Sequence, residues 1–280
     1  GLFGNFKLLF NANEEELYRT RVFSSEMINQ FKEIKKEESL IEDYIISICE
    51  KENINIIPLY SEDYPSNLKN LPDAPLFFYA QGDLNLLKGK KVAIVGSRKS
   101  EESALNWAKK LSEDLVKESI TIVSGGAIGI DSQAHLGALG FQGKTICVLG
   151  SGLLRLYPPV NKNLFEEIKK KGLLISEHPP TDKGGILSLL RRNRIISGIS
   201  DSIVIVTSAK VGGSRTQIEI ANKQRIPSFV PKLSLNLKPN EGIEEAISLH
   251  RINEIEDYKE VLKTIQGKKD DFSIQKKLLS

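Results

Sequence analysis

The sequence is poor in the side chains that proteins use most for metal binding and covalent catalysis. It has two cysteines and three histidines, and none of them stands at the spacing of a metal-ligand set. Cys49 and Cys147 lie far apart, each inside an apolar run, which favours two buried free thiols in a reducing compartment over a disulfide. We therefore expect a cytoplasmic protein with no metal and no cofactor.

Long apolar runs are also missing. No segment approaches the roughly 20 apolar residues that a membrane-spanning helix needs. The first ten residues are apolar, but they have neither a basic front nor a small-residue cleavage site, so no signal peptide is predicted. We expect no membrane partner.

The charged side chains are present but unevenly distributed, although the formal net charge is only +3. Residues 13–52 carry 11 acidic and six basic side chains, whereas residues 88–231 carry 22 basic and 12 acidic ones. A basic core beside an acidic head favours a polyanionic partner. Ordinary solvated lysines would give the same totals, so charge alone leaves both interpretations open.

Residues 88–235 show a regular alternation of short apolar runs and helix-length segments. The expected strands are 92–95, 120–123, 145–149, 173–176, 203–206 and 228–230, and the expected helices are 101–118, 130–140, 161–171, 188–199 and 214–224. This alternation predicts an α/β fold, with a mostly parallel sheet and helices on both faces. Ligands of such sheets bind at the carboxyl ends of the strands.

The flanking segments differ from this core. Residues 1–55 predict a short helical N-terminal cap, because apolar residues recur at helical spacing among charges over 14–52. Residues 56–87 contain four prolines and two strand-like runs, which predicts an extended connector packed on the core. Residues 236–280 predict a helical C-terminal tail, and no winged helix is expected there.

A glycine-rich loop follows the expected strand 120–123 and leads into a helix. Its glycines, Gly125 and Gly126, let a ligand approach the backbone closely, and the helix start offers N–H groups to an anion. The spacing is neither that of the dinucleotide-binding motif nor that of the P-loop. The loop therefore favours phosphate binding without indicating which ligand carries the phosphate.

Three further loops at strand ends could bind phosphate. Gly96, Ser97 and Arg98 end the first core strand, and Arg98 could offer several donors, unless these residues only cap a helix and lie on the surface. A later run contains the candidate ligands Arg192 and Asn193 among Arg191 and Arg194. One of these arginines could instead form a buried ion pair with Glu177 or Asp201.

The last of these loops contains Gly213 and Ser214 at the start of a helix, with Lys210 nearby. It is a second helix start that could accept an anion, and simple turn chemistry is the alternative. Two such loops on adjacent strand ends could hold successive phosphates.

Asp131 and His135 lie four residues apart and would share one face of a helix. Such a pair could perform acid–base catalysis. No nucleophile or metal set accompanies it, so we favour a structural role, in which Asp131 caps the helix and His135 bonds a neighbouring loop.

Taken together, these blocks resemble the DNA-processing protein A family (DprA, also called Smf). The resemblance rests on motifs whose order and spacing match over about residues 56–231: Tyr64-Pro65 with Leu68, Pro75-Leu76, Gly82-Asp83, the 92–98 and 124–135 blocks, Gly150 and Gly152, Tyr157-Pro158, Ser176-Glu177, Pro179-Pro180, the 192–198 block and Gly213-Ser214. Leu154 stands where the family often has Asp, and the usual Phe-Pro before Arg192 is missing.

The resemblance implies a cytoplasmic Rossmann-like domain that is not an enzyme. Such a protein binds single-stranded DNA in DNA processing and natural transformation, works as a homodimer and helps load the RecA recombinase. The resemblance assigns DNA-phosphate contacts to ten positions: Gly96, Ser97, Arg98, Gly125, Gly126, Arg192, Asn193, Lys210, Gly213 and Ser214.

Two other functions remain in competition with this one. A nucleotide hydrolase related to the lysine-decarboxylase-like group would need a Glu in a Pro-Gly-Gly-x-Gly-Thr setting, which this sequence lacks. A nucleotide-ligand sensor in a defence or signalling system could use the same pocket. For the homodimer, we expect the last core strands to leave Ile218, Ile220, Ile226 and Phe229 as an uncovered apolar corner.

Overall fold

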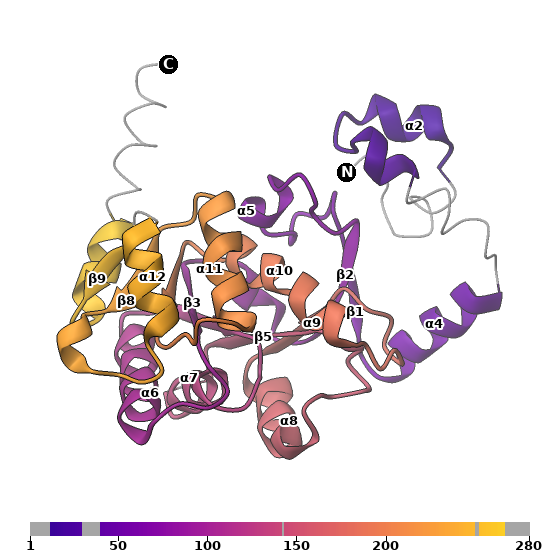
Figure 1. The fold of residues 1–280 in the computed structure, drawn as a ribbon. Helices are drawn as coiled ribbons and strands as arrows, with labels where there is room; N and C mark the ends of the chain where they lie inside the picture. The colour runs from indigo at the N-terminus through magenta and orange to yellow at the C-terminus, as the bar shows by residue number, and fades with distance from the viewer. Residues whose placement is uncertain (1–11, 30–39, 142, 250–251, 267–280) are drawn as a thin grey trace.

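The computed structural model describes residues 12–29, 40–141, 143–249 and 252–266. Within them, nine strands form one sheet in the order β1-β2-β6-β5-β4-β3-β7-β8-β9 (Figure 1). The strands are β1 (Asn55–Pro58), β2 (Phe77–Gly82), β3 (Lys91–Val95), β4 (Thr121–Ser124), β5 (Thr145–Leu149), β6 (Leu173–Ser176), β7 (Ser202–Ile205), β8 (Ser228–Pro231) and β9 (Asn253–Ile255). From β6 to β9 all neighbours pair in parallel, which confirms the predicted α/β class.

Helices cover both faces of this sheet, as Figure 1 shows. On one face lie α6 (Glu102–Lys117), α7 (Ile130–Leu139) and α8 (Lys162–Lys171), and on the other lie α10 (Asn193–Gly198), α11 (Gly213–Lys223) and α12 (Glu241–Leu249). Side chains of β3 alternate between the faces: Val92 and Ile94 pack with α6 and α7, whereas Ala93 and Val95 pack with α10 and α11. Burial on both faces explains why the strands read as continuous apolar runs.

The expected helix 188–199 is divided at Arg192. Residues before it form α9 (Ile186–Arg191) and residues after it form α10. The backbone N–H of Arg192 still donates to Ser188 at 3.0 Å, and its carbonyl accepts from Ile195 at 2.9 Å. The division places Arg192 where its side chain can turn back toward the sheet.

The sheet extends beyond the core boundaries suggested by the sequence. The two strand-like runs of the expected connector form β1 and β2, and β2 pairs antiparallel with β6. Residues 56–87 thus belong partly to the sheet, because β2 supplies the backbone partners that the β6 edge would otherwise lack. At the other end β9, which the sequence pattern did not indicate, pairs in parallel with β8.

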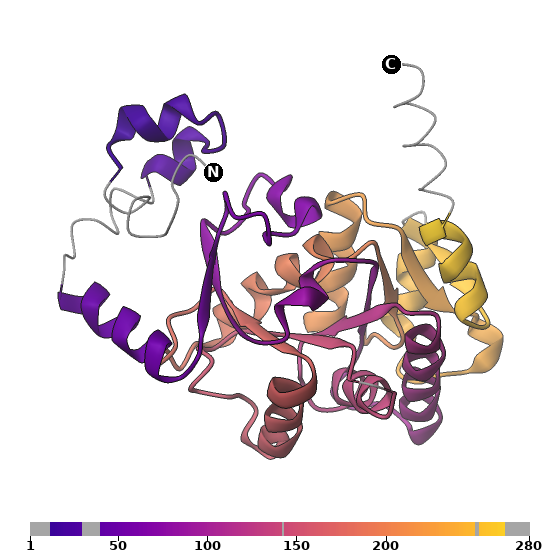
Figure 2. The same cartoon turned by 180° about the vertical axis from the view of Figure 1, so that it is seen from behind.

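Short helices lie in the connections. They are the α-helix α5 (Ser66–Lys69) and three 3₁₀-helices, η1 (Leu84–Leu87), η2 (Pro159–Asn161) and η3 (Leu233–Leu235). The N-terminal helices α2 (Glu14–Arg19) and α4 (Leu40–Lys51) lie at the β1–β2 end of the molecule, opposite β9 (Figure 2). Residues 1–11, 30–39 and 267–280 lie outside the described residues, and so do parts of the predicted helical cap and tail. Residues 258–266 are helical.

The apolar corner that we expected near the last strands is not exposed. Ile218 on α11 is 1% exposed and Phe229 on β8 is 2% exposed, and Ile220 and Ile226 are half-buried. The expectation was wrong because α12 and β9, which come later in the chain, cover this part of the sheet. Dimer formation stays a prediction, but this corner does not supply its surface.

Candidate nucleic-acid interface

A cleft of 1460 Å³ opens at the carboxyl ends of the parallel strands. It lies where the strand order reverses: the chain moves from β3 through β4 and β5 to β6, then returns to place β7 on the other side of β3. The loops after β3 and β7 diverge at such a point and leave a crevice between them. The lining includes the end of β3 with residues 96–101, residues 209 and 211–214 after β7, part of α9 and residues 238–239.

The loop after β3 forms one side of the cleft and is fixed to β7. Ser97 donates its backbone N–H to Thr207 Oγ1 at 3.1 Å, and the Ser100 hydroxyl lies 2.9 Å from the same oxygen. A Cβ at Gly96 would come within 2.6 Å of Ile130, so glycine allows the loop to pack against α7. Arg98 is exposed and pairs with no acidic side chain among the described residues. Its guanidinium is therefore free to meet an anion.

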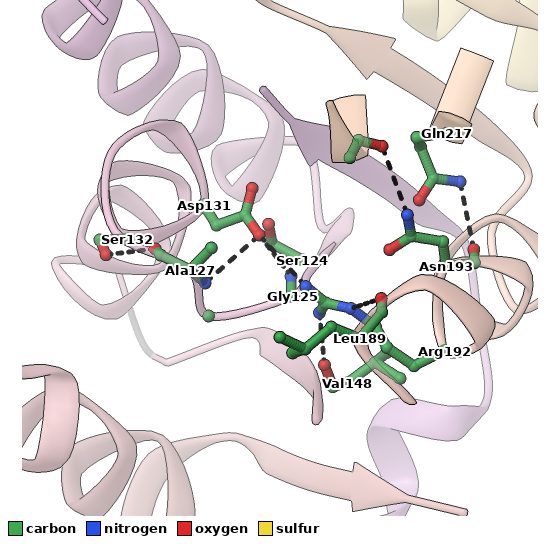
Figure 3. Close-up of polar contacts among 12 residues, drawn as sticks. Ser124, Gly125, Ala127, Asp131, Ser132, Val148, Leu189, Arg192, Asn193 and Gln217 are labelled. Carbon is green, nitrogen blue, oxygen red and sulfur yellow. Dashed lines mark hydrogen bonds and ion pairs between the residues drawn. The ribbon is translucent and has the colours of Figure 1, made fainter. Parts of the chain in front are cut away.

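Asp131 organises the loop after β4. Its buried carboxylate accepts the backbone N–H of Gly125 at 3.2 Å and of Ala127 at 3.4 Å (Figure 3). Burial raises the pKa of Asp131, while Arg192 and the N–H groups of Gly96, Gly125 and Ala127 lower it. We had expected Asp131 to cap α7, but none of the described side chains caps this helix, and Asp131 ties the loop together instead.

Arg192 and Asn193 lie on the floor of the cleft and already have partners inside the protein. Arg192 is 7% exposed and donates to the carbonyls of Val148, at 2.6 Å, and Leu189, at 3.3 Å. Its Nη2 atom lies 3.9 Å from the Asp131 carboxylate (Figure 3). Burial lowers the pKa of Arg192 and the charge of Asp131 opposes this shift. Arg192 therefore holds the floor in shape, whatever else it contacts.

Gly125 has to be glycine because the Arg192 guanidinium lies directly over it. A Cβ at Gly125 would overlap the Nη1, Cζ and Nη2 atoms of Arg192. Asn193 is fixed in a similar way: its Nδ2 donates to the Gly213 carbonyl at 3.4 Å, and its own carbonyl accepts from Gln217 at 3.1 Å. These contacts connect the floor to the start of α11.

The start of α11 forms the opposite side of the cleft. Gly212 has a φ of 140°, and a Cβ at Gly212 or Gly213 would meet no atom within 4 Å. This free space leaves the first N–H groups of α11 open to a ligand. The Ser214 hydroxyl donates to that of Ser208 at 3.1 Å, which holds the turn against the loop after β7.

The structure brings most of the ten predicted residues together, but not all. Seven line the cleft: Gly96, Ser97, Arg98, Arg192, Asn193, Gly213 and Ser214. Gly125 lines a small adjoining recess. Gly126 is buried, where a Cβ would come within 2.5 Å of Phe165, and Lys210 is exposed outside the lining. Of the neighbouring arginines, Arg194 forms the ion pair with Glu177 that we considered, at 2.7 Å.

Sequence reasoning missed several residues that line the cleft. Lys99 directly follows Arg98 and could have been included. Tyr157 belongs to a motif of the family resemblance but was assigned no contact, and nothing local connects Lys238 to this site. The lining also holds three acidic side chains, Glu101, Asp131 and Glu241, against four basic ones, Arg98, Lys99, Arg192 and Lys238. The excess of positive charge in the core is therefore weak in the cleft itself.

His135 does not form a dyad with Asp131. It is fully buried, and its Nδ1 lies 2.7 Å from Thr145 Oγ1. Because the Thr145 hydroxyl donates to the Ile122 carbonyl at 3.1 Å, Nδ1 carries the proton, and Nε2 is a buried lone pair that finds no partner among the described residues. Burial lowers the pKa of His135 to about 3. His135 is a neutral core residue joining α7 to β5.

The described ranges bear on two other kinds of site, a metal centre and a membrane span. Within them, no group of three or more His, Cys, Asp or Glu side chains is placed to hold a metal ion. None of their helices combines the length and apolarity needed to cross a membrane. Cys49 and Cys147 are buried free thiols, as the sequence predicted.

Residues 55–266 match the family model of DNA recombination-mediator protein A. The chain belongs to this family. The match runs from β1 to the helix after β9, so it includes every strand of the sheet and every loop that lines the cleft. It confirms the resemblance drawn from the motifs.

Individual members of this family agree with the match. The DNA processing protein DprA of Bacillus subtilis (strain 168) is 36% identical over 171 residues, which are 61% of this chain and 58% of that protein. Protein Smf of Synechocystis sp. is 39% identical over 165 residues, 58% of this chain and 42% of that protein. The chain thus spans about half the length of these relatives.

Solved structures of the family have the same fold. DprA from Streptococcus pneumoniae superposes with a TM-score of 0.72 at 29% identity, covering 84% of this chain and 81% of that one. DNA processing protein A from Helicobacter pylori, which was studied for its single-stranded DNA binding mode, superposes with a TM-score of 0.69 at 30% identity. The superposition covers 77% of this chain and 96% of that one.

Proposed function

We propose that this protein binds single-stranded DNA in the cleft between the loops after β3 and β7. One observation carries the proposal: Arg98, which pairs with no acidic side chain in the part of the chain that the structure describes, and the open N–H groups at the start of α11 face the same cleft from adjacent strand ends. Together they could hold phosphates of one DNA strand. Membership of a DNA-processing family supports DNA over other polyanions.

The decisive experiment compares ligands in one titration. Fluorescence anisotropy of a labelled oligo-dT should show binding, with weaker competition from duplex DNA of equal length and from ATP, AMP and GTP. Stronger binding to duplex would contradict the proposal. If a nucleotide binds tightly and oligo-dT does not, the cleft serves the nucleotide-sensor function instead.

The finer role follows from the family and is proposed with it. The protein would act in the cytoplasm in DNA processing during natural transformation, and it would help load a RecA-type recombinase onto the bound DNA strand. Adding this protein to a recombinase and oligo-dT covered by single-strand-binding protein should shorten the lag of the DNA-dependent ATPase. An unchanged lag would limit the function to DNA binding.

We also propose that the protein works as a homodimer. Three of the exposed apolar side chains lie near the C-terminal end of the sheet: Leu233, Leu235 and Leu249. These exposed side chains, on η3 and at the end of α12, are the candidates for dimer contacts, because Ile218 and Phe229 are buried. Light scattering at micromolar concentration should give twice the chain mass of 31.2 kDa. A monomer that still binds oligo-dT would refute the dimer alone.

Finally, we propose that binding is not accompanied by turnover. Asp131 and His135 are both engaged in holding loops and core, so they are poor candidates for acid–base catalysis. The protein should therefore not hydrolyse nucleotides at a measurable rate. Robust hydrolysis that disappears in His135→Ala would overturn this proposal and favour the hydrolase alternative.

A further inference from the structure

The cleft is lined in part by apolar side chains that are open to solvent. Tyr157, Ile186 and Val211 all line it, and they are 47%, 79% and 87% exposed. Exposed apolar side chains around one cleft mark a binding surface, because a ligand that covers them removes their apolar area from water, which is favourable. Arg98 and the start of α11 line the same cleft and suit phosphates. The cleft therefore has complementary surfaces for the two parts of a nucleotide chain.

Tyr157 is distinctive among the residues that line the cleft. It is the single aromatic residue among the described residues that line the cleft. It also lines the small recess of 40 Å³ that adjoins the cleft, together with Arg98 and Arg192. A flat ring thus stands beside two guanidinium groups, and planar nucleobases stack on both kinds of side chain.

The loop that carries Tyr157 is fixed at its beginning. Gly152 donates its backbone N–H to the Asp182 carbonyl at 2.8 Å, and Leu154 donates to the Pro180 carbonyl at 2.9 Å. A Cβ at Gly152 would overlap the carbonyls of Pro179 and Pro180, so the two segments are in close backbone contact. The loop therefore enters the cleft along one defined path.

The same loop is fixed at its end. The side chain of Asn161 donates through Nδ2 to the Gly126 carbonyl and to the Ser132 hydroxyl, both at 2.9 Å. Gly126 thus acts indirectly: it anchors the Tyr157 loop instead of meeting the ligand. An aromatic side chain held on a rigid loop loses little conformational entropy on binding, which is what a stacking surface requires.

We propose that Tyr157 is a base-stacking platform, on which one nucleobase of the bound DNA strand stacks while Arg98 and the start of α11 hold the neighbouring phosphates. This assignment rests on the proposed function and specifies which residues meet the bases and which meet the phosphates. Ile186 and Val211, which are exposed in the same cleft, offer apolar contacts to the adjacent bases. Tyr157 thereby makes the protein respond to bases, and not only to a sugar–phosphate chain.

The test compares Tyr157→Ala on two DNA strands of equal length, oligo-dT and an abasic strand with the same phosphates. Loss of one stacking contact should raise the Kd for oligo-dT about 5- to 100-fold and leave the Kd for the abasic strand within about twofold. Tyr157→Phe should bind oligo-dT like the wild type. Tyr157→Leu keeps an apolar side chain and should lose affinity like Tyr157→Ala, since it has no flat face.

Controls separate this inference from the proposed function. Tyr44, which is 57% exposed on α4 outside the cleft, gives the matched variant Tyr44→Ala, whose Kd should not change. Wild-type protein that does not bind oligo-dT would refute the proposed function itself. Wild-type binding with an unchanged Kd in Tyr157→Leu and Tyr157→Ala, or with equal losses on both DNA strands, would refute the stacking role alone. If Tyr157→Ala does not fold, Tyr157→Leu and Tyr157→Phe decide the question.

Discussion

At the scale of single residues, the cleft contains two kinds of side chain: exposed ones that could meet a ligand, and buried ones that hold the floor in shape. Arg98 belongs to the first kind, while Asp131, Arg192 and His135 belong to the second. Sequence motifs do not distinguish the two, because both occur next to glycines at strand ends. The distinction predicts different outcomes for mutations that look equivalent in the sequence.

Arg98→Ala should weaken binding of oligo-dT without destabilising the protein. A hydrogen bond to a charged group contributes about 1.5–3 kcal/mol, whereas replacing an exposed loop side chain changes the free energy of unfolding by about 0.5 kcal/mol or less. Anisotropy and urea unfolding measure the two effects. Lys210→Ala is the matched control, because Lys210 is exposed but does not line the cleft. Equal losses in both variants would show that the effect of Arg98 is not local.

Gly125→Ala should destabilise the fold and weaken binding together. The new Cβ would overlap the Arg192 guanidinium, which cannot move without breaking its bond to Val148. Overpacking of this kind costs about 1–3 kcal/mol. Gly140→Ala is the control, because its Cβ would approach no atom closer than 3.4 Å. Unfolding in urea compares them, and an unperturbed Gly125→Ala protein would show that Arg192 can reposition freely.

Acid should destabilise the protein through His135. Its pKa is about 3 in the folded state, below the value of about 6.5 expected when unfolded. The unfolded state therefore binds a proton that the folded state does not, so stability is complete above pH 6.5 and is lost as pH falls toward 3. The free energy of unfolding should drop by about 1.4 kcal/mol from pH 7.5 to 5.5.

The variant His135→Asn isolates this contribution. Asn can still donate to Thr145 but does not titrate. The free energy of unfolding of the wild type minus that of the variant should therefore be smaller at pH 5.5 than at pH 7.5, by about 1.4 kcal/mol. The comparison also removes the effect of Asp131, whose pKa burial raises and which titrates in the opposite sense. A pH-independent difference would mean that His135 is protonated in the folded state.

At the scale of elements, the start of α11 is the clearest candidate for an anion-binding helix terminus. Gly213→Ala should leave the protein as stable as the wild type or more stable, by up to about 1 kcal/mol, since alanine restricts the unfolded chain and meets no atom here. Binding of oligo-dT should nevertheless weaken, because the methyl group projects into open space beside the exposed N–H groups. A stable variant with unchanged affinity would show that phosphates do not approach this helix closely.

The helices and strands also show where sequence patterns were sufficient. The expected helices 101–118, 130–140, 161–171 and 214–224 agree closely with α6, α7, α8 and α11. Three of these helices, α6, α8 and α11, have one apolar face, and α7 is bounded by Gly129 and Gly140. The expected helix 188–199 was divided at Arg192, whose side-chain bonds to a distant strand are invisible to local periodicity. The strand β9 was missed because its residues, Asn253–Ile255, lack an apolar run.

At the scale of the whole molecule, the excess of basic side chains should matter less for binding than the sequence suggests. Of the basic side chains that line the cleft, Arg98, Lys99 and Lys238 remain for phosphates, since Arg192 is bonded internally. Three phosphate contacts predict a slope of about −2 in log K against log salt concentration for single-stranded DNA. Anisotropy at several salt concentrations measures it, and a slope near zero or steeper than about −5 would contradict this count.

The sequence by itself determined the α/β class, most strand and helix positions, the family and the glycine loops at the strand ends. These features depend on local periodicity and on glycine spacing, which the chain shows directly. Only the tertiary structure decided what each motif residue does. It buried Gly126 and Arg192, left Arg98 and Gly213 open, and covered Ile218 and Phe229 with later elements. It also brought Tyr157 and Lys238 into the cleft, because strand order, not sequence order, sets which loops become neighbours.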